Sequence, residues 1–148
     1  MKFYSDGTCG DIVKWLRILG FDTSADYKNP AKVALKNSMN EERIFITRSD
    51  MLCESHYENI VKIPRGTFEG LNFLKERGFL NNIKPFTRCL VCNSELKNVD
   101  YSYVKDRVPQ YVYKTYSEFK ICPTCDRIYW QGTHIENMIR ILKNASIL

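Results

Sequence analysis

The sequence predicts an α/β protein in which a parallel sheet flanked by helices is followed by a small β-rich zinc ribbon and a closing helix. Strand and helix patterns alternate along residues 1–80, which is typical of a parallel sheet with helices on both faces. Two Cys-x-x-Cys pairs, at 89–92 and 122–125, lie in a stretch rich in β-forming residues. An apolar content of 44% with 26% charged residues indicates a folded chain.

The individual elements follow from periodicity and cap residues. Residues 2–5 predict a short strand that ends at Asp6, and residues 10–20 carry apolar side chains at helical spacing up to a terminal Gly20. A strand at 21–24 precedes a helix at 29–40, which is expected to begin with Asn29 as N-cap and Pro30 at its first position. The remaining elements of the sheet domain are a strand at 43–47, a short helix at 48–56, a strand at 59–64 and a helix at 67–79 ended by Gly78.

The character of the chain changes from about Arg88. Cysteine pairs, β-forming residues and tyrosines dominate from about Arg88 to Trp130, and residues 134–144 read as an amphipathic helix. We therefore expect two domains, residues 1–84 and 85–148, joined at residues 81–87.

The cysteines predict a structural metal site. The N-terminus has no signal-peptide core and no stretch is long and apolar enough to span a membrane, so we expect a cytoplasmic protein. Thiols are reduced there, and paired Cys-x-x-Cys then indicates zinc, with disulfides or a redox role as the alternative. The expected Zn²⁺ ligands are Cys89, Cys92, Cys122 and Cys125. Four thiolates leave no open position for catalysis. Cys9 and Cys53 are expected to be small buried hydrophobic residues.

Basic and aromatic side chains in the second half suggest a polyanionic partner. Residues 81–148 hold 10 basic and 6 acidic side chains, against 12 and 11 in residues 1–80. A four-thiolate zinc site adds negative charge to this half, so the charge argument is modest. Aromatics interleaved with cations can stack unpaired bases, but they can equally fill the core of a small module. The candidate RNA-binding residues here are Arg107, Arg127, Tyr129, Trp130 and His134, the last with a helix-start or packing role as its alternative.

Acidic residues at the carboxyl ends of the strands predict a second kind of metal site. Phosphodiester cleavage with Mg²⁺ or Mn²⁺ needs carboxylates that converge on the ion. Asp6 is the first candidate, Asp50 the second, and Asp22 or Asp26 could support them. For Asp6 and Asp50 the structural alternative is helix capping. For Asp22 and Asp26 the alternative is a position on the surface. Arg48 could contact a phosphate or be solvated.

Three segments carry a family resemblance: FYSDGTCGDIVKWLRILGFDT, RIFITRSDML and DRVPQYVYKTYSEFKICPTCDRIYWQGTHIENM. Over essentially its whole length the chain resembles the Mut7-C family. The resemblance implies a PIN-like RNase domain followed by a zinc ribbon, and a metal-dependent RNA cleavage site in which Asp6 matches the first acidic position. Two positions depart from the family pattern: Ser49 stands where an aspartate usually follows TR, and Asn29 where the second helix usually opens with an acid.

These features lead to two expectations about function. The first is a metal-dependent ribonuclease that hydrolyses RNA phosphodiester bonds, with the zinc ribbon aiding RNA binding. The alternative is a catalytically degenerate RNA- or ribosome-binding protein, since a site with few carboxylates binds a divalent cation weakly. The expected partners are RNA, with the ribosome or tRNA as candidates, and no membrane. The sequence assigns no oligomeric state.

Overall fold

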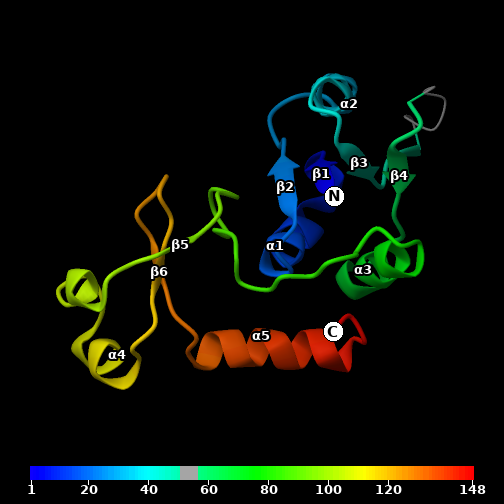
Figure 1. Cartoon of the computed structure of the whole chain (residues 1–148). Coiled ribbons are helices and arrows are strands. Elements are labelled where there is room, and N and C mark those ends of the chain that lie inside the picture. The colour runs from blue at the N-terminus through cyan, green and yellow to red at the C-terminus, as the bar shows by residue number, and fades with distance from the viewer. Residues whose placement is uncertain (51–56) are drawn as a thin grey trace. The chain divides into compact units, whose positions relative to one another are not determined.

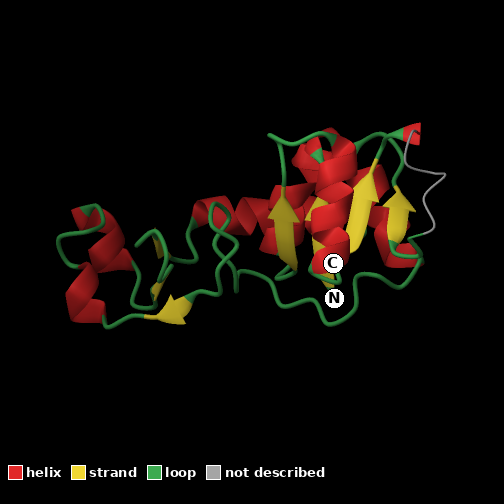
Figure 2. Cartoon of the chain, turned by 90° about the horizontal axis from the view of Figure 1, so that it is seen from above, coloured by secondary structure: helices red, strands yellow, loops and turns green. Residues whose placement is uncertain are grey.

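The computed structural model describes residues 1–50 and 57–148, which form two compact units, residues 1–93 and 94–148. The first unit is an α/β layer structure and the second a small antiparallel sheet with helices (Figures 1 and 2). These architectures confirm the predicted fold class. The domain boundary expected after residue 84 stays a prediction, whereas the compact units divide after Asn93.

The sheet of the first unit is parallel throughout. Its strands are β1 (Lys2–Ser5), β2 (Asp22–Ala25), β3 (Ile44–Thr47) and β4 (Ile60–Lys62), in the order β2-β1-β3-β4. α1 (Gly10–Ile18) and α3 (Thr67–Glu76) cover one face, and α2 (Ala31–Asn40) covers the other (Figure 1). The order reverses between β1 and β3, so their carboxyl ends form the switch point at which such sheets bind ligands.

Alternating side chains of the central strands fill both faces of this sheet. Tyr4 of β1 and Phe45 of β3 pack with Ala34 and Leu35 of α2. Their neighbours along the strands, Phe3 and Ile46, are fully buried as well. Burial on both faces explains why consecutive residues at the centre of each of these short strands are apolar.

The turn after α1 confirms the predicted helix end. Gly20 has φ 92°, and hydrogen bonds from Gly20 N to Arg17 O and from Phe21 N to Leu16 O form a Schellman motif. A Cβ at position 20 would lie 2.2 Å from the carbonyl oxygen of Lys84. Glycine is therefore required here both by the backbone conformation and by the close approach of the chain.

The start of α2 differs by one residue from the sequence expectation. Pro30 is the N-cap residue and Ala31 the first helical residue, so Asn29 lies outside the helix. Its side-chain amide donates a hydrogen bond to Asp26 instead. The expected short helix at 48–56 lies largely outside the described residues, as do Cys53 and His56.

The second unit contains a three-stranded antiparallel sheet in the order β5-β6-β7. Its elements are β5 (Lys97–Asn98), η3 (Tyr101–Val104), α4 (Gln110–Thr115), β6 (Lys120–Ile121), β7 (Ile128–Tyr129) and α5 (Thr133–Asn144). Val104, Val112 and Phe119 form its core, and Tyr116 and Trp130 pack against them. Many of the aromatics noted in the sequence are thus structural.

Candidate functional site

Asp6 lies at the switch point of the parallel sheet. It follows the last residue of β1, is only 2% exposed, and caps the short 3-10 helix η1 (Gly7–Cys9). Oδ1 accepts hydrogen bonds from Thr8 N at 2.9 Å and from Thr8 Oγ1 at 2.5 Å. Oδ2 accepts one from Thr47 Oγ1, at the end of β3, at 2.6 Å. The capping alternative for Asp6 is therefore observed.

The two threonine hydroxyls that contact Asp6 are themselves oriented by backbone donors. Arg48 N donates to Thr8 Oγ1 at 2.9 Å, and Ser49 N donates to Thr47 Oγ1 at 3.0 Å. A hydroxyl that accepts an N–H must aim its own hydrogen elsewhere, and in both cases the acceptor is Asp6. Three of about four lone-pair positions of the carboxylate are then filled, which leaves room for a further ligand on Oδ2.

Asp26 is the second aspartate at this edge of the sheet, and it holds a turn. Its Oδ1 accepts from Lys28 N at 3.2 Å and Asn29 N at 3.0 Å, and its Oδ2 from Asn29 Nδ2 at 2.9 Å and Tyr4 Oη at 3.2 Å. The Asn29 amide, with the backbone donors of the turn, lowers the pKa of Asp26 to about 2. All four acceptor positions are in use, so this carboxylate serves the turn. An acid at position 29 could not donate to it, which gives the departure at Asn29 a physical reason.

The structure does not bring Asp22 to this edge. Asp22 begins β2, where it pairs with Lys2, whereas Ala25 at the other end of β2 pairs with Ser5. Three residues of strand separate the two edges by about 10 Å. Asp22 forms an ion pair with Arg43 at 2.6 Å and accepts from Asn93 Nδ2 at 2.7 Å. Partial burial raises the pKa of Asp22, but the hydrogen bonds from Arg43 and Asn93 outweigh this and leave it lowered.

Asp50 lies after the end of β3 with its side chain 85% exposed and paired with Lys62. A carboxylate in this setting is solvated, and its ion pair adds little stability. Catalytic roles for Asp50, Asp22 and Asp26 stay predictions. Within residues 1–50 and 57–148, the only cluster of three or more His, Cys, Asp or Glu ligand groups is the cysteine cluster described below.

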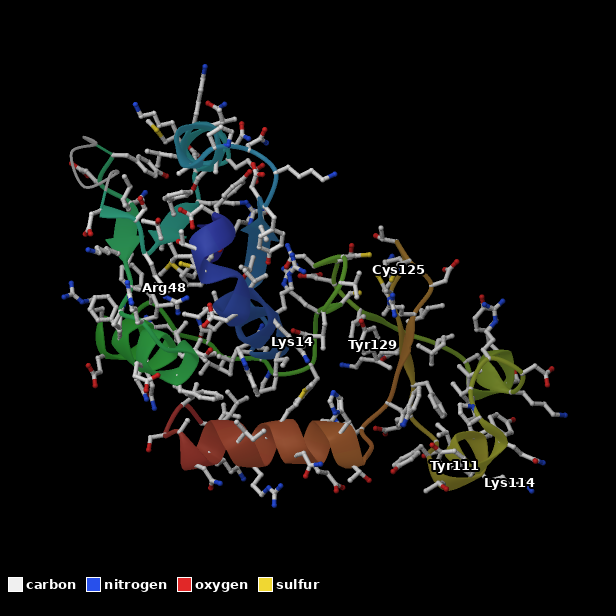
Figure 3. The ribbon with its side chains drawn as sticks, turned by 180° about the vertical axis from the view of Figure 1, so that it is seen from behind. Lys14, Arg48, Tyr111, Lys114, Cys125 and Tyr129 are labelled. Atoms are coloured by element: carbon white, nitrogen blue, oxygen red, sulfur yellow. The ribbon has the colours of Figure 1, made fainter. Side chains whose placement is uncertain are left out.

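The guanidinium of Arg48 donates hydrogen bonds only to residues of the first unit among those described (Figure 3). Its guanidinium forms a bidentate pair with Asp11, at 2.6 and 3.1 Å. The remaining N–H groups donate to the carbonyl oxygens of Thr8, Pro64 and Gly66 at 2.9, 3.1 and 3.3 Å. Since all five donors are used, Arg48 ties β3 to α1 and to the loop before α3.

The four paired cysteines form a cluster that fits a zinc ion. The sulfur atoms of Cys89, Cys92, Cys122 and Cys125 all lie within 4.8 Å of one another, and none of these four residues forms a disulfide in the described part of the chain. A tetrahedral Zn²⁺ about 2.3 Å from each sulfur would place the sulfurs about 3.8 Å apart. The donor set and spacing suit zinc, so the described residues support a possible metal site here.

Each cysteine pair is built in the same way. Asn93 N donates to Cys89 O at 3.0 Å, and Asp126 N donates to Cys122 O at 2.9 Å. Asn93 and Asp126, which directly follow the pairs, both have positive φ, 65° and 60°. Asn and Asp tolerate this conformation better than other non-glycine residues, so their positions in the sequence signal these turns.

Sequence reasoning missed the side chains that anchor the first pair. Arg17 Nη1 donates to Leu90 O at 2.9 Å and to Val91 O at 3.1 Å, while its other nitrogens donate to Thr23 O. Asn93 Oδ1 accepts from Thr23 N at 2.9 Å. These contacts link residues 89–93 to the edge strand β2, and no local sequence pattern marks them.

The candidate RNA-binding residues of the second unit differ in exposure. Arg107, Arg127 and His134 are exposed, and the Arg107 guanidinium lies 4.1 Å from the centre of the Tyr103 ring. Trp130 packs toward Phe119, so it belongs to the core. Tyr129 is half-buried in β7 (Figure 3). The most exposed aromatic of this unit is Tyr111 on α4, 71% exposed and close in sequence to Lys114 (Figure 3).

Comparison with known protein families decides the assignment. The family model of the Mut7-C RNAse domain matches residues 1–142 of the 148-residue chain. The chain belongs to the Mut7-C family. No curated protein and no solved structure gave a match. Membership confirms the resemblance seen in the sequence and supports a ribonuclease function for this Mut7-C protein. No helix among the described residues is long and apolar enough to cross a membrane.

Proposed function

We propose that this Mut7-C protein is a metal-dependent ribonuclease whose reaction is centred on Asp6. The observation that carries the proposal is the position of a buried, oriented carboxylate at the switch point of a parallel sheet. Thr8 and Thr47 fix both of its oxygens, which is the preorganisation that a catalytic ligand needs. The substrate class comes from the family, whose model is named for an RNAse domain.

A single carboxylate such as that of Asp6 is consistent with the way in which Mg²⁺ is coordinated in proteins. Mg²⁺ usually keeps several waters and binds through one or two carboxylates plus substrate phosphates. The open position on Oδ2 of Asp6 would hold it, and such an ion supplies an activated water and neutralises charge on the phosphate. The chain's own contribution is to hold the Asp6 carboxylate in one geometry, because Thr8 and Thr47 donate hydrogen bonds to its two oxygens.

A second candidate function is RNA binding without cleavage. The observation in its favour is that, in the described part of the chain, no second carboxylate joins Asp6 in a metal-ligand cluster. Asp26 holds a turn, Asp22 lies at the other edge, and Asp50 pairs with Lys62. In this role the exposed Arg107, Arg127 and His134 would contribute to RNA binding, together with Tyr111.

The first prediction separates these candidates. A panel of single-stranded and structured RNAs is incubated with Mn²⁺ and with wild type, Asp6→Asn or Asp100→Asn protein. Asp100 is a matched control because its Oδ1 also accepts from the backbone N and hydroxyl of the residue two positions on, Ser102. We expect cleavage by wild type and Asp100→Asn, and a loss of at least about 100-fold in Asp6→Asn.

The Asp6→Asn variant must be folded for its loss of cleavage to be interpreted. Asparagine keeps the shape and the capping oxygen of Asp6, and thermal melts of all three proteins establish that they are folded. Equal cleavage by Asp6→Asn and wild type would contradict the assigned site. Absence of cleavage by every protein, together with RNA binding by all, would favour the second candidate.

A further inference from the structure

One aromatic side chain stands out next to the candidate active site. Tyr27 is 61% exposed, and among the described residues of the first unit it is the only exposed aromatic. It follows Asp26, whose backbone N donates to Ser5 O at 2.9 Å, directly beside Asp6. One strand spacing and one residue separate the Cα atoms of Asp6 and Tyr27 by at most about 9 Å.

The position of Tyr27 is fixed by a rigid turn. Asp26 accepts four hydrogen bonds, three of them from Lys28 and Asn29, so the residues on both sides of Tyr27 are held. The ring also lies against the backbone of Gly10 at the start of α1, where an added Cβ would come within 3.1 Å of Tyr27 Cε1. One side of the ring is therefore backed by protein while most of the side chain remains open to solvent.

Positive charge accompanies the ring. Lys28 is the next residue and is exposed, and Lys14 is exposed on α1, one helical turn after Gly10 (Figure 3). Within the described residues, neither lysine forms a salt bridge. A single exposed aromatic has no meaning by itself. A ring that contacts the protein on one side, with one lysine next in sequence and another one helical turn into α1, neither in a salt bridge with a described residue, is a combination suited to a base and its neighbouring phosphates.

We propose that Tyr27 forms a nucleobase subsite, on which one unpaired base of single-stranded RNA stacks while Lys14 and Lys28 contact the flanking phosphates. The proposal rests on the proposed function in taking RNA as the ligand and Asp6 as the place of reaction. It adds a reason for the turn at residues 26–29: the turn carries a base platform instead of a further metal ligand. A strand held on Tyr27 places its phosphates over the switch point. Duplex RNA, whose bases are already stacked, gains nothing from this subsite.

The test measures RNA binding apart from cleavage. Affinities of full-length wild type, Tyr27→Phe, Tyr27→Leu and Lys14→Gln are measured by fluorescence anisotropy, without added divalent ions, for a fluorescein-labelled single-stranded 12-mer RNA. The same measurement uses a 12-mer in which all the bases are removed. Leucine is apolar but has no aromatic face, so it is the matched control for phenylalanine.

We expect Tyr27→Phe to bind the intact RNA within twofold of wild type, and Tyr27→Leu to bind it between about fivefold and about a hundredfold more weakly. Affinity for the base-free strand should be the same in all three. Lys14→Gln should weaken binding of both strands and reduce the salt dependence. Wild-type affinity in Tyr27→Leu, weak binding by Tyr27→Phe, or equal losses on both strands would each overturn base stacking. If binding depends on the bases but no RNA is cleaved, the nuclease function is rejected and the Tyr27 subsite is kept. If RNA is cleaved but the Tyr27 substitutions leave affinity unchanged, the nuclease function is kept and the subsite is rejected.

Discussion

At the scale of single residues, Arg48 shows how a side chain suited to phosphate can be committed to the fold. Its guanidinium contacts Asp11 and three backbone carbonyls, and its own N–H holds the hydroxyl of Thr8 toward Asp6. Asp11 is held in turn by Thr67 Oγ1 at 2.6 Å. The hydrogen bonds from Arg48 are the main cause of the lowered pKa of Asp11. Arg48 is thus a support for the Asp6 geometry, and its use as an RNA ligand stays a prediction from sequence.

This commitment predicts what Arg48→Lys does. Lysine cannot reproduce the planar fork, so we expect the free energy of unfolding to fall by about 1–3 kcal/mol, mostly from lost hydrogen bonds to carbonyls. Because Asp11 is partly exposed, the ion pair between Arg48 and Asp11 contributes the smaller part of this loss of stability. RNA affinity should change less than twofold. The measurement is urea unfolding followed by Trp15 fluorescence in a Trp130→Phe background, which reports on the first unit only.

Arg65→Lys serves as the control, since Arg65 is an exposed arginine of the loop before α3. It should leave both stability and affinity unchanged. If Arg48→Lys unfolded like wild type but bound RNA much more weakly, Arg48 would be a ligand after all.

Residue positions at the sheet edge could be predicted from sequence only in part. Asp6 directly follows a predicted strand whose last three residues are buried, so its place is a local property. Whether Asp22 or Asp26 lies beside it depends on the register of β2 against β1, and a four-residue strand with the sequence DTSA has no clear apolar alternation to indicate that register. The environment of Arg48 depends on residues from three elements and carried no local signal.

At the scale of elements, β2 is an edge strand whose free side is closed by side chains. Thr23 N donates to Asn93 Oδ1, and Thr23 O accepts from Arg17. These contacts protect an exposed edge from pairing with other chains. The contact between Thr23 and Asn93 also attaches residues 89–93 to β2. Arg88 adds to this attachment, because its guanidinium donates to Gly20 O and to Asn93 O. The first cysteine pair therefore has support that does not depend on a metal ion.

We accordingly expect zinc removal to act unevenly. Amides of β6 and β7 should exchange rapidly after chelation, because a three-stranded sheet of two-residue strands has little to hold it. The amides of Thr23 and Asn93 should stay protected. Hydrogen exchange is measured residue by residue with and without chelator. Each measurement compares the amides of β6 and β7 with those of Thr23 and Asn93 in the same protein sample.

Asn93→Gly is the matched variant for this experiment, because glycine keeps the positive φ of position 93 without strain. It removes the acceptor of Thr23 N while the zinc ligands stay in place, and it should raise exchange at Thr23 about 10- to 100-fold with zinc bound. Equal exposure of Thr23 and β6 amides on chelation of the wild type would show that the metal, not Arg17 and Asn93, holds residues 89–93.

The whole molecule combines two units with different sources of stability. The first buries both faces of a parallel sheet, and the second has a small core of Val104, Val112 and Phe119. From two kinds of pattern, alternating strand and helix against paired cysteines, the sequence predicts two domains, residues 1–84 and 85–148. That boundary stays a prediction, and the first cysteine pair lies in the first of the two compact units, which divide after Asn93. Each unit also holds one tryptophan, Trp15 and Trp130, so their unfolding can be followed separately and need not be two-state for the chain.

Acid should unfold the first unit in a defined pH window. The folded-state pKa values of Asp11, Asp22 and Asp26 are all lowered by their hydrogen bonds, that of Asp26 to about 2. A lowered pKa stabilises the fold at pH values above the unfolded pKa of about 3.9, and this contribution is lost as the pH falls through the folded value. Stability followed by Trp15 should thus drop steeply between about pH 4 and about pH 2.

Asp26→Asn isolates the largest of these contributions. The variant cannot be neutralised by acid and has lost acceptor capacity for the turn, so it should be less stable than wild type at pH 7 and lose less stability below pH 4. The two curves converge as wild-type Asp26 is protonated. Asp126→Asn, an exposed aspartate in the second unit, should keep the wild-type profile of Trp15. Parallel curves for wild type and Asp26→Asn would mean that the turn before α2 does not depend on the charge of Asp26.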